Sequence, residues 1–146
     1  MFALAALTTG AAAAEPGWIA DPGTGCKLWN PNPQPDESIH WTGSCRDGLA
    51  DGQGVLSWYG KDKSKEVERE AGGFRKGRMS GHGTQTFANG NKATGDFVEG
   101  RMNGRGTLIR ANGERYTGSW RGGRWDGFGT LVWKNGDRYI GFWHDG

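Results

Sequence analysis

Long apolar runs and metal-binding motifs are scarce in this 146-residue sequence. Its longest run of apolar and small residues covers the first 14 positions, whereas a membrane-spanning helix needs roughly 20 such residues. The three histidines are His40, His82 and His144, and none is spaced from another histidine or a cysteine as metal ligands are. Apolar residues make up 34% of the chain, too few for a thick globular core. The sequence therefore predicts no membrane-spanning helix and no metal site.

The sequence also lacks a set of residues that would form an active site. Asp47 and Asp51 are close in the sequence, but nothing nearby would separate their pKa values as acid and base catalysis requires. Cys45 and His40 cannot act as nucleophile and base if Cys45 is oxidised. The Gly-x-Gly pairs are not followed by the helix that a phosphate-binding loop needs. We therefore expect no catalytic residue and no cofactor.

Glycine, in contrast, is abundant, with 28 residues, and it recurs at fixed positions. From Glu70 the sequence repeats every 23 residues, as EAGGFRKGRMSGHGTQTFANGNK, ATGDFVEGRMNGRGTLIRANGER, YTGSWRGGRWDGFGTLVWKNGDR and finally YIGFWHDG. An earlier copy, WTGSCRDGLADGQGVLSWYG, begins at Trp41 and is separated from the next by the insertion KDKSKEVER. The chain therefore holds four full copies and a fifth that is cut short.

The spacing within each copy predicts a β-hairpin. Tyr116, Gly118 and Trp120 alternate along the chain, so they share one face of a strand. The missing side chain at Gly118 leaves room for aromatic rings to lie against the backbone. A second strand is expected over residues 127–133. We predict that Asn-Gly pairs join the strands through type I′ turns; these pairs are Asn89–Gly90, Asn112–Gly113 and Asn135–Gly136.

The motif Y-x-G-x-W-x-x-G-x-x-x-G-x-G, which begins at Tyr116 and is closed by Gly136, resembles the MORN repeat family over residues 41–146. The resemblance implies an all-β fold, an elongated single-layer solenoid of antiparallel β-hairpins that bury their rings against neighbouring repeats. Some copies depart from the motif, because Glu70 and Ala93 replace the leading tyrosine and Cys45 replaces the tryptophan. The aromatic residues expected in the repeat core are Trp41, Phe74, Phe97, Tyr116, Trp120, Tyr139 and Trp143.

The N-terminal 40 residues divide into two parts. Residues 1–14 are similar to a signal peptide that ends in small residues, although no basic residue precedes Lys27. We expect export to a periplasmic or extracellular location, and an alanine-rich arm of a cytoplasmic protein is the alternative. Residues 15–40 form an arm rich in proline and asparagine. Cys26 and Cys45 are predicted to form a disulfide that fastens this arm to the first repeat, and two unpaired thiols are the alternative.

Charge is distributed unevenly along the chain. Residues 1–70 carry six Lys or Arg and ten Asp or Glu, whereas residues 71–146 carry twelve and six. The cations of the repeats recur in two columns, which form either a solvated surface or a stripe for acidic partners or lipid head groups. Nucleic acid is not expected, because the net charge is only +2. The first column is Arg69, Lys92, Arg115 and Arg138, and the second is Arg78, Arg101 and Arg124.

These features favour a non-catalytic, exported scaffold of MORN repeats that mediates protein–protein contacts. MORN arrays are also attached to lysine methyltransferases and plant phosphoinositide kinases, but neither catalytic domain is present in this sequence. One alternative is a peripheral binder of anionic phospholipid, and a second is an accessory or regulatory subunit of an enzyme. The last eight residues provide the first strand of a fifth repeat. We expect this edge strand either to pair in a homodimer or to belong to a longer array, and an exposed strand that frays is the alternative.

Overall fold

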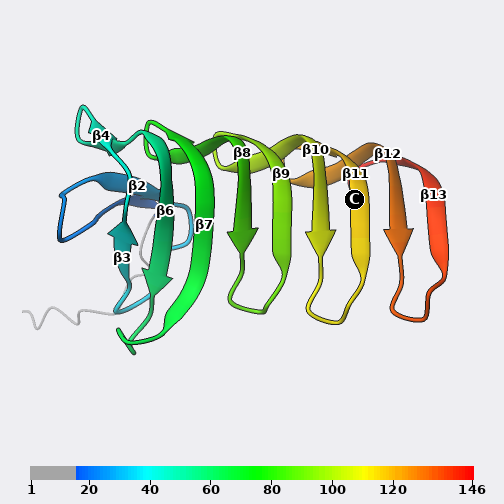
Figure 1. Cartoon of the computed structure of the whole chain (residues 1–146), viewed down its shortest axis with the longest axis horizontal. Coiled ribbons are helices and arrows are strands. Elements are labelled where there is room, and N and C mark those ends of the chain that lie inside the picture. Colours follow the sequence, from blue (N-terminus) through cyan, green and yellow to red (C-terminus); the bar gives the residue numbers. More distant parts are fainter. Residues whose placement is uncertain (1–15) are drawn as a thin grey trace, which may run out of the picture.

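The computed structural model describes residues 16–146, so the predicted signal peptide lies outside the described residues. Every regular element in the described part of the chain is a strand (Figure 1). No helix there is long and apolar enough to cross a membrane. The strands are β1 (Gly17–Ala20), β2 (Lys27–Asn30), β3 (Ser38–Trp41), β4 (Cys45–Arg46), β5 (Leu49–Ala50), β6 (Gly52–Tyr59), β7 (Glu66–Arg75), β8 (Arg78–Thr86), β9 (Lys92–Val98), β10 (Arg101–Ile109), β11 (Arg115–Arg121), β12 (Arg124–Val132) and β13 (Arg138–Trp143).

Nine of these strands form one open antiparallel sheet. Its order is β13-β12-β11-β10-β9-β8-β7-β6-β3, so from β6 onward each strand pairs with its neighbour in the sequence. The strands follow one another along the long axis of the molecule (Figure 1). The predicted all-β solenoid of stacked hairpins is confirmed. The first strand of the sheet, β3, begins inside the segment that we assigned to the arm.

The turn inside each repeat is a two-residue turn with a left-handed backbone at both positions. Lys76 and Gly77 have φ angles of 50° and 78°, and Glu99 and Gly100 have φ angles of 48° and 81°. Such values are those of a type I′ turn, whose twist matches the right-handed twist of the flanking strands. Left-handed pairs recur at Asp47–Gly48, Gly122–Gly123 and Asp145–Gly146.

The Asn-Gly pairs have a different geometry, so our prediction that they form type I′ turns was wrong. Between β8 and β9, for example, only Gly90 has a positive φ, of 89°. The loop is longer than two residues and closes through hydrogen bonds of 2.9 Å from Phe87 N–H to the Asn91 carbonyl and from Gly90 N–H to the Phe87 carbonyl. Asn89 accepts a hydrogen bond from the Asn91 N–H through its side chain, at 2.9 Å. Asparagine is used here for an Asx turn rather than for a positive φ.

A row of glycines crosses the sheet and explains how the rings pack. A Cβ placed on Gly129 would lie 2.6 Å from the Tyr116 ring, and one on Gly141 would lie 2.9 Å from the Tyr139 ring. The rings therefore lie directly on the glycine backbone. Where tyrosine is replaced by Ala93, the Met102 side chain lies over the glycine instead. The paired row is Gly54, Gly72, Gly83, Gly95, Gly106, Gly118, Gly129 and Gly141.

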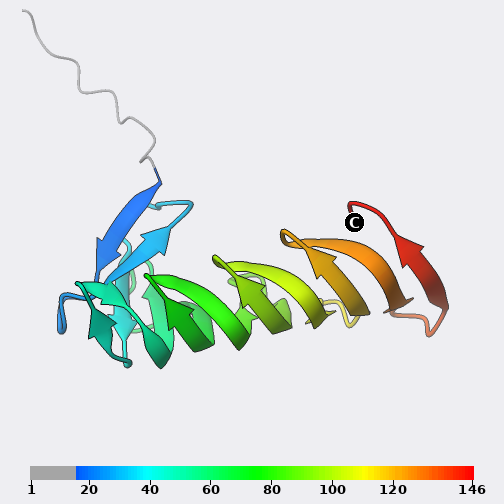
Figure 2. The same cartoon turned by 90° about the horizontal axis from the view of Figure 1, so that it is seen from above.

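The arm strands β1 and β2 join β5 and β4 of the first repeat in a second, four-stranded sheet, in the order β1-β2-β5-β4. Its β1–β2 hairpin stands out from the row of repeats at the N-terminal end (Figure 2). The predicted disulfide is present between Cys26 and Cys45, whose Cα atoms are 5.7 Å apart. Cys26 is buried, whereas Cys45 is exposed on β4. The disulfide therefore links the arm to the first repeat.

Candidate functional site

Each repeat bends where its strands pass the glycine row. The pairing register shifts between Gly72 and Phe74, between Met102 and Gly106, and between Gly118 and Trp120. Shifts of this kind insert extra residues into one strand and sharpen its bend. In Figure 1 the hairpins fold over at their upper ends, next to the type I′ turns. The inner face of the bent sheet is therefore concave.

A continuous groove runs along this inner face. A cavity of about 430 Å³ includes Glu70, Phe74 and Arg101 in its lining, and a second of about 490 Å³ includes Phe97 and Arg101. The two cavities share Arg101 and Gln85. A third cavity of about 240 Å³, next to Trp125, shares lining residues with the second: Leu108, Trp120 and Gly123. Because successive cavities share walls, they form one groove over successive repeats.

Three of the aromatic residues expected in the core, Phe74, Phe97 and Trp120, line the groove. Trp41, Phe74, Phe97, Tyr116 and Trp120 are buried. The structure adds members that the motif does not contain, since the Trp125 ring stacks on the Tyr116 ring at 4.3 Å. In contrast, Tyr139 is 44% exposed. Its strand, β13, lies at the edge of the sheet and pairs only with β12 in the described part of the chain.

Glu70 is the least expected residue in the groove. It is half-buried and lies directly opposite Gln85 on the next strand. Burial raises the pKa of its carboxyl to about 7, and the charge of Glu68 adds to this effect. A hydrogen bond of 3.3 Å that the Trp58 indole donates to the carboxylate lowers the pKa and partly offsets the burial. The only signal for this residue in the sequence is that Glu70 replaces the leading tyrosine of its repeat.

The first column of cations lies on the outer face of the sheet, opposite the groove. The strand register places Arg69 opposite Thr86, and Thr86 opposite Lys92. The same pairing continues across the sheet, so the column contributes one cation per repeat to a single row. The four are exposed, and only Arg69 makes an ion pair among the described residues, with Glu66 at 3.3 Å. Uncharged residues separate the cations, and the complete row is Arg69, Thr86, Lys92, Ile109, Arg115, Val132 and Arg138.

The second column follows the type I′ turns, but its three members differ in their surroundings. Arg78 is half-buried, and its guanidinium lies 4.6 Å from the centre of the Trp29 ring. Arg101 and Arg124 are exposed and border the groove. None of the three forms an ion pair within residues 16–146. The column is therefore a basic margin along one side of the groove, with Arg78 covered by the arm.

Two of the histidines, His82 and His144, are exposed and lie next to carboxylates. His82 lies 3.4 Å from Asp96, and His144 lies 3.7 Å from Asp126 and 3.3 Å from Asp145. Asp126, His144 and Asp145 place ligand atoms within 4.8 Å of one another, an arrangement that sequence spacing did not reveal. Two of the three are exposed, as groups of surface charges often are. None of these pairs faces the groove cavities described above.

Comparison with known sequences agrees with the stacking of the hairpins. The sequence model of the MORN repeat matches four consecutive segments, residues 42–63, 71–92, 94–115 and 116–138. Each matched segment after the first covers the two strands of one hairpin and the type I′ turn between them. No curated protein matches the chain. The four matched segments together cover more than half of the sequence, and the chain therefore belongs to the MORN-repeat family.

Proposed function

We propose that the chain is a non-catalytic scaffold that binds an extended segment of a partner protein in the inner groove. The observation that carries this proposal is the continuity of the groove over successive repeats. Rings and methionines line the groove together with several polar or charged side chains, among them Glu70, Gln85 and Arg101. An apolar lining with a few polar groups is the usual composition of a binding site. The straight row of repeats suits a linear segment better than a globular surface.

Adjacent residues on opposite faces allow a direct test. Gln85 lines two of the groove cavities, whereas Thr86 lies in the outer basic row. Both are half-buried. A photo-crosslinking amino acid placed at position 85 should give an adduct with a protein from the envelope fraction of the producing cells, and one at position 86 should not. Adducts from position 86 alone, or none from either position, would contradict the proposal.

We further propose that the protein acts outside the cytoplasm, in the periplasm or the extracellular space. The disulfide between Cys26 and Cys45 supports this location, because such bonds persist in oxidising compartments. An accessory or regulatory subunit, our second alternative, would be the same kind of scaffold with an enzyme as its partner. Fractionation of the producing cells, followed by mass mapping of the unreduced peptides, tests the location. Recovery of the protein from the cytoplasm with both thiols free would refute it.

Binding to anionic phospholipid is a second candidate, which the outer basic row favours. Lys92, Arg115 and Arg138 are exposed, in register, and free of ion pairs among the described residues. Changing all three to Gln should abolish sedimentation with vesicles that contain phosphatidylglycerol, because charge drives such binding. The triple change of Arg78, Arg101 and Arg124 to Gln removes the same charge elsewhere and is the matched control. Unchanged sedimentation of the outer-row variant would exclude the lipid candidate.

A further inference from the structure

The type I′ turns are stacked on one another by a repeated hydrogen bond. The Gly77 N–H donates to the Ala50 carbonyl at 2.8 Å, and the Gly100 N–H donates to the Met79 carbonyl at 2.9 Å. The Gly123 N–H continues the series at 2.9 Å, to the Met102 carbonyl. Because the turns share this bond and similar φ angles, they present equivalent backbone groups along one edge of the molecule.

The arm already uses two of these turns as a template for a strand. In β2, the Lys27 N–H donates to the Gly48 carbonyl and the Trp29 N–H donates to the Gly77 carbonyl, each at 2.9 Å. An extended segment therefore lies across the turns and pairs with their glycine carbonyls. The Trp18 ring of β1 packs over Gly77, so that a Cβ there would lie 2.6 Å from it. The arm covers the first two turns in this way.

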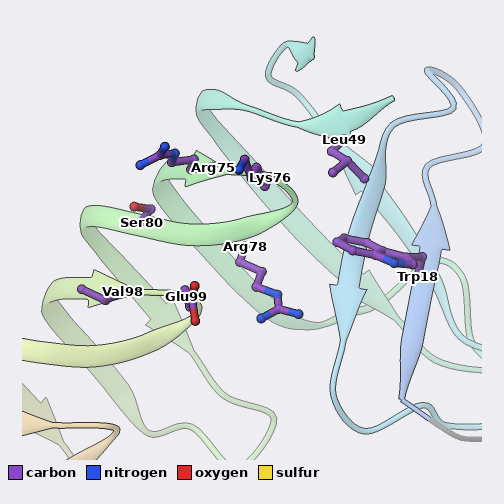
Figure 3. Close-up of a pocket in the computed structure, with 8 residues that line it drawn as sticks. All are labelled: Trp18, Leu49, Arg75, Lys76, Arg78, Ser80, Val98 and Glu99. Carbon is purple, nitrogen blue, oxygen red and sulfur yellow. The ribbon is translucent and has the colours of Figure 1, made fainter. Parts of the chain in front are cut away.

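After β2 the chain leaves this line before it reaches the third type I′ turn, Glu99–Gly100. Every second N–H of β2 faces the turns, at Lys27 and at Trp29. The next residue in this alternation is Pro31, and proline has no N–H to donate. Within residues 16–146, no hydrogen bond reaches the carbonyls of Gly100 and Gly123. A cavity of about 510 Å³ adjoins this point, between the arm and the repeats. In Figure 3, Arg78 extends toward the arm and Trp18, and Val98 and Glu99 lie beyond it along the row.

The charge around the uncovered turns is positive. Val98 pairs across the third turn with Arg101. Across the fourth turn, Gly122–Gly123, Arg124 pairs with Arg121, which also lies 3.7 Å from Asp126. The cavity next to the arm is lined by the further cations Arg75, Lys76 and Arg78 and by a single acidic side chain, Glu99.

We propose that the carbonyls of Gly100 and Gly123 bind an extended acidic peptide segment of a partner protein, which continues the line of β2. Backbone N–H groups of the peptide would pair with the two carbonyls, as those of Lys27 and Trp29 do with Gly48 and Gly77. Acidic side chains of the peptide would face Arg101 and Arg124. The inference deepens the proposed scaffold function and rests on it, because the ligand is a protein and because Gly100, Arg101 and Gly123 also line the groove. A lipid head group offers no row of N–H donors.

The test uses the full, disulfide-bonded chain with ¹³C and ¹⁵N labels and the peptide acetyl-EVEVEV-amide. On titration, the carbonyl carbon resonances of Gly100 and Gly123 should move downfield, because they acquire hydrogen bonds. Those of Gly48 and Gly77 should stay in place, since β2 already occupies them. A peptide N-methylated on both edges and the lysine analogue acetyl-KVKVKV-amide are controls, and neither should produce the shifts.

Charge variants complete the test. Arg101→Gln with Arg124→Gln should weaken binding of the acidic peptide about three- to tenfold, as loss of partly exposed charge pairs does. Lys92→Gln with Arg115→Gln removes the same charge from the outer face and should have no effect. Binding without the two carbonyl shifts, equal binding of the N-methylated peptide, or no binding at about 1 mM peptide would overturn the inference. Crosslinking from the groove at position 85 would stand in each of these cases, so failure here is distinct from failure of the proposed function.

Discussion

Glycine serves two separate purposes at the residue scale. Gly129 has no free space around it, because the Tyr116 ring lies on its backbone. Gly100 has nothing within 4 Å of the position that a Cβ would take, but its φ of 81° belongs to the left-handed region. A side chain is therefore excluded by packing at the first position and by backbone conformation at the second.

The packing role predicts a large cost for Gly129→Ala. The new methyl group would overlap the Tyr116 ring, and such overpacking destabilises by about 1–3 kcal/mol. Gly60→Ala is the matched control, since Gly60 has an ordinary φ and nothing within 4 Å of its added Cβ. It should change the free energy of unfolding by less than about 1 kcal/mol. Urea denaturation of both variants checks this, and equal stabilities would contradict the account of the glycine row.

The raised pKa of Glu70 predicts how the stability of the fold depends on pH. Its pKa is raised to about 7 in the folded state from an ordinary value of 4.5, so the folded state binds the proton more tightly. The stability that this provides is complete below pH 4.5 and is lost as the pH rises through 7. Glu70→Gln should remove this loss and raise the free energy of unfolding at pH 8 by up to about 3 kcal/mol. Denaturation curves at several pH values provide the measurement, and parallel pH profiles for the two proteins would refute the assignment.

At the scale of elements, the strands could be predicted from the sequence and the turns only in part. Alternation of Tyr116, Gly118 and Trp120 sets which side chains share a face, and this depends only on strand geometry. The turns depend on the number of residues between the strands. Lys76–Gly77 and Glu99–Gly100 have no strong type I′ signature, because neither Lys nor Glu favours a left-handed backbone. The Asn-Gly pairs carry that signature but lie in longer loops.

The disulfide predicts a measurable contribution of the arm to stability. Reduction of the bond between Cys26 and Cys45 should lower the free energy of unfolding by about 3 kcal/mol, because it releases the closure of the intervening loop. Thermal unfolding with and without reductant gives the difference. The double variant Cys26→Ala with Cys45→Ala should match the reduced protein and should not respond to reductant. An unchanged unfolding temperature on reduction would show that hydrogen bonds alone hold the arm.

At the scale of the whole molecule, the groove could not be derived from the repeat motif. The motif gives the content of one hairpin, but the cavities arise between hairpins, from shared walls such as Arg101 and Trp120. The bend depends on register shifts inside each hairpin, and the spacing of glycines and rings in the motif did not lead us to predict them. The outer basic row could be anticipated, because a fixed repeat length puts Arg69, Lys92 and Arg115 in register.

The exposed edge of the sheet leads to a prediction about association. β13 pairs only with β12 among the described strands, and its Phe142 side chain is 78% exposed. Unpaired strand edges with apolar side chains favour pairing with another chain. We expect the chain to form a two-fold homodimer through β13 that dissociates when residues 139–146 are deleted. Light scattering after size exclusion measures this, and a monomer at tens of micromolar would refute it.

Binding of a partner in the inner groove can be measured as the affinity of the chain for the partner that crosslinking identifies. Gln85→Arg places a long charged side chain in the groove, whereas Thr86→Arg places the same side chain on the outer face. Calorimetric titration should show that Gln85→Arg weakens binding at least about tenfold, as changes at central interface positions do, with no change for Thr86→Arg. Equal affinities for the two variants, or a loss confined to Thr86→Arg, would show that the partner does not bind in the inner groove.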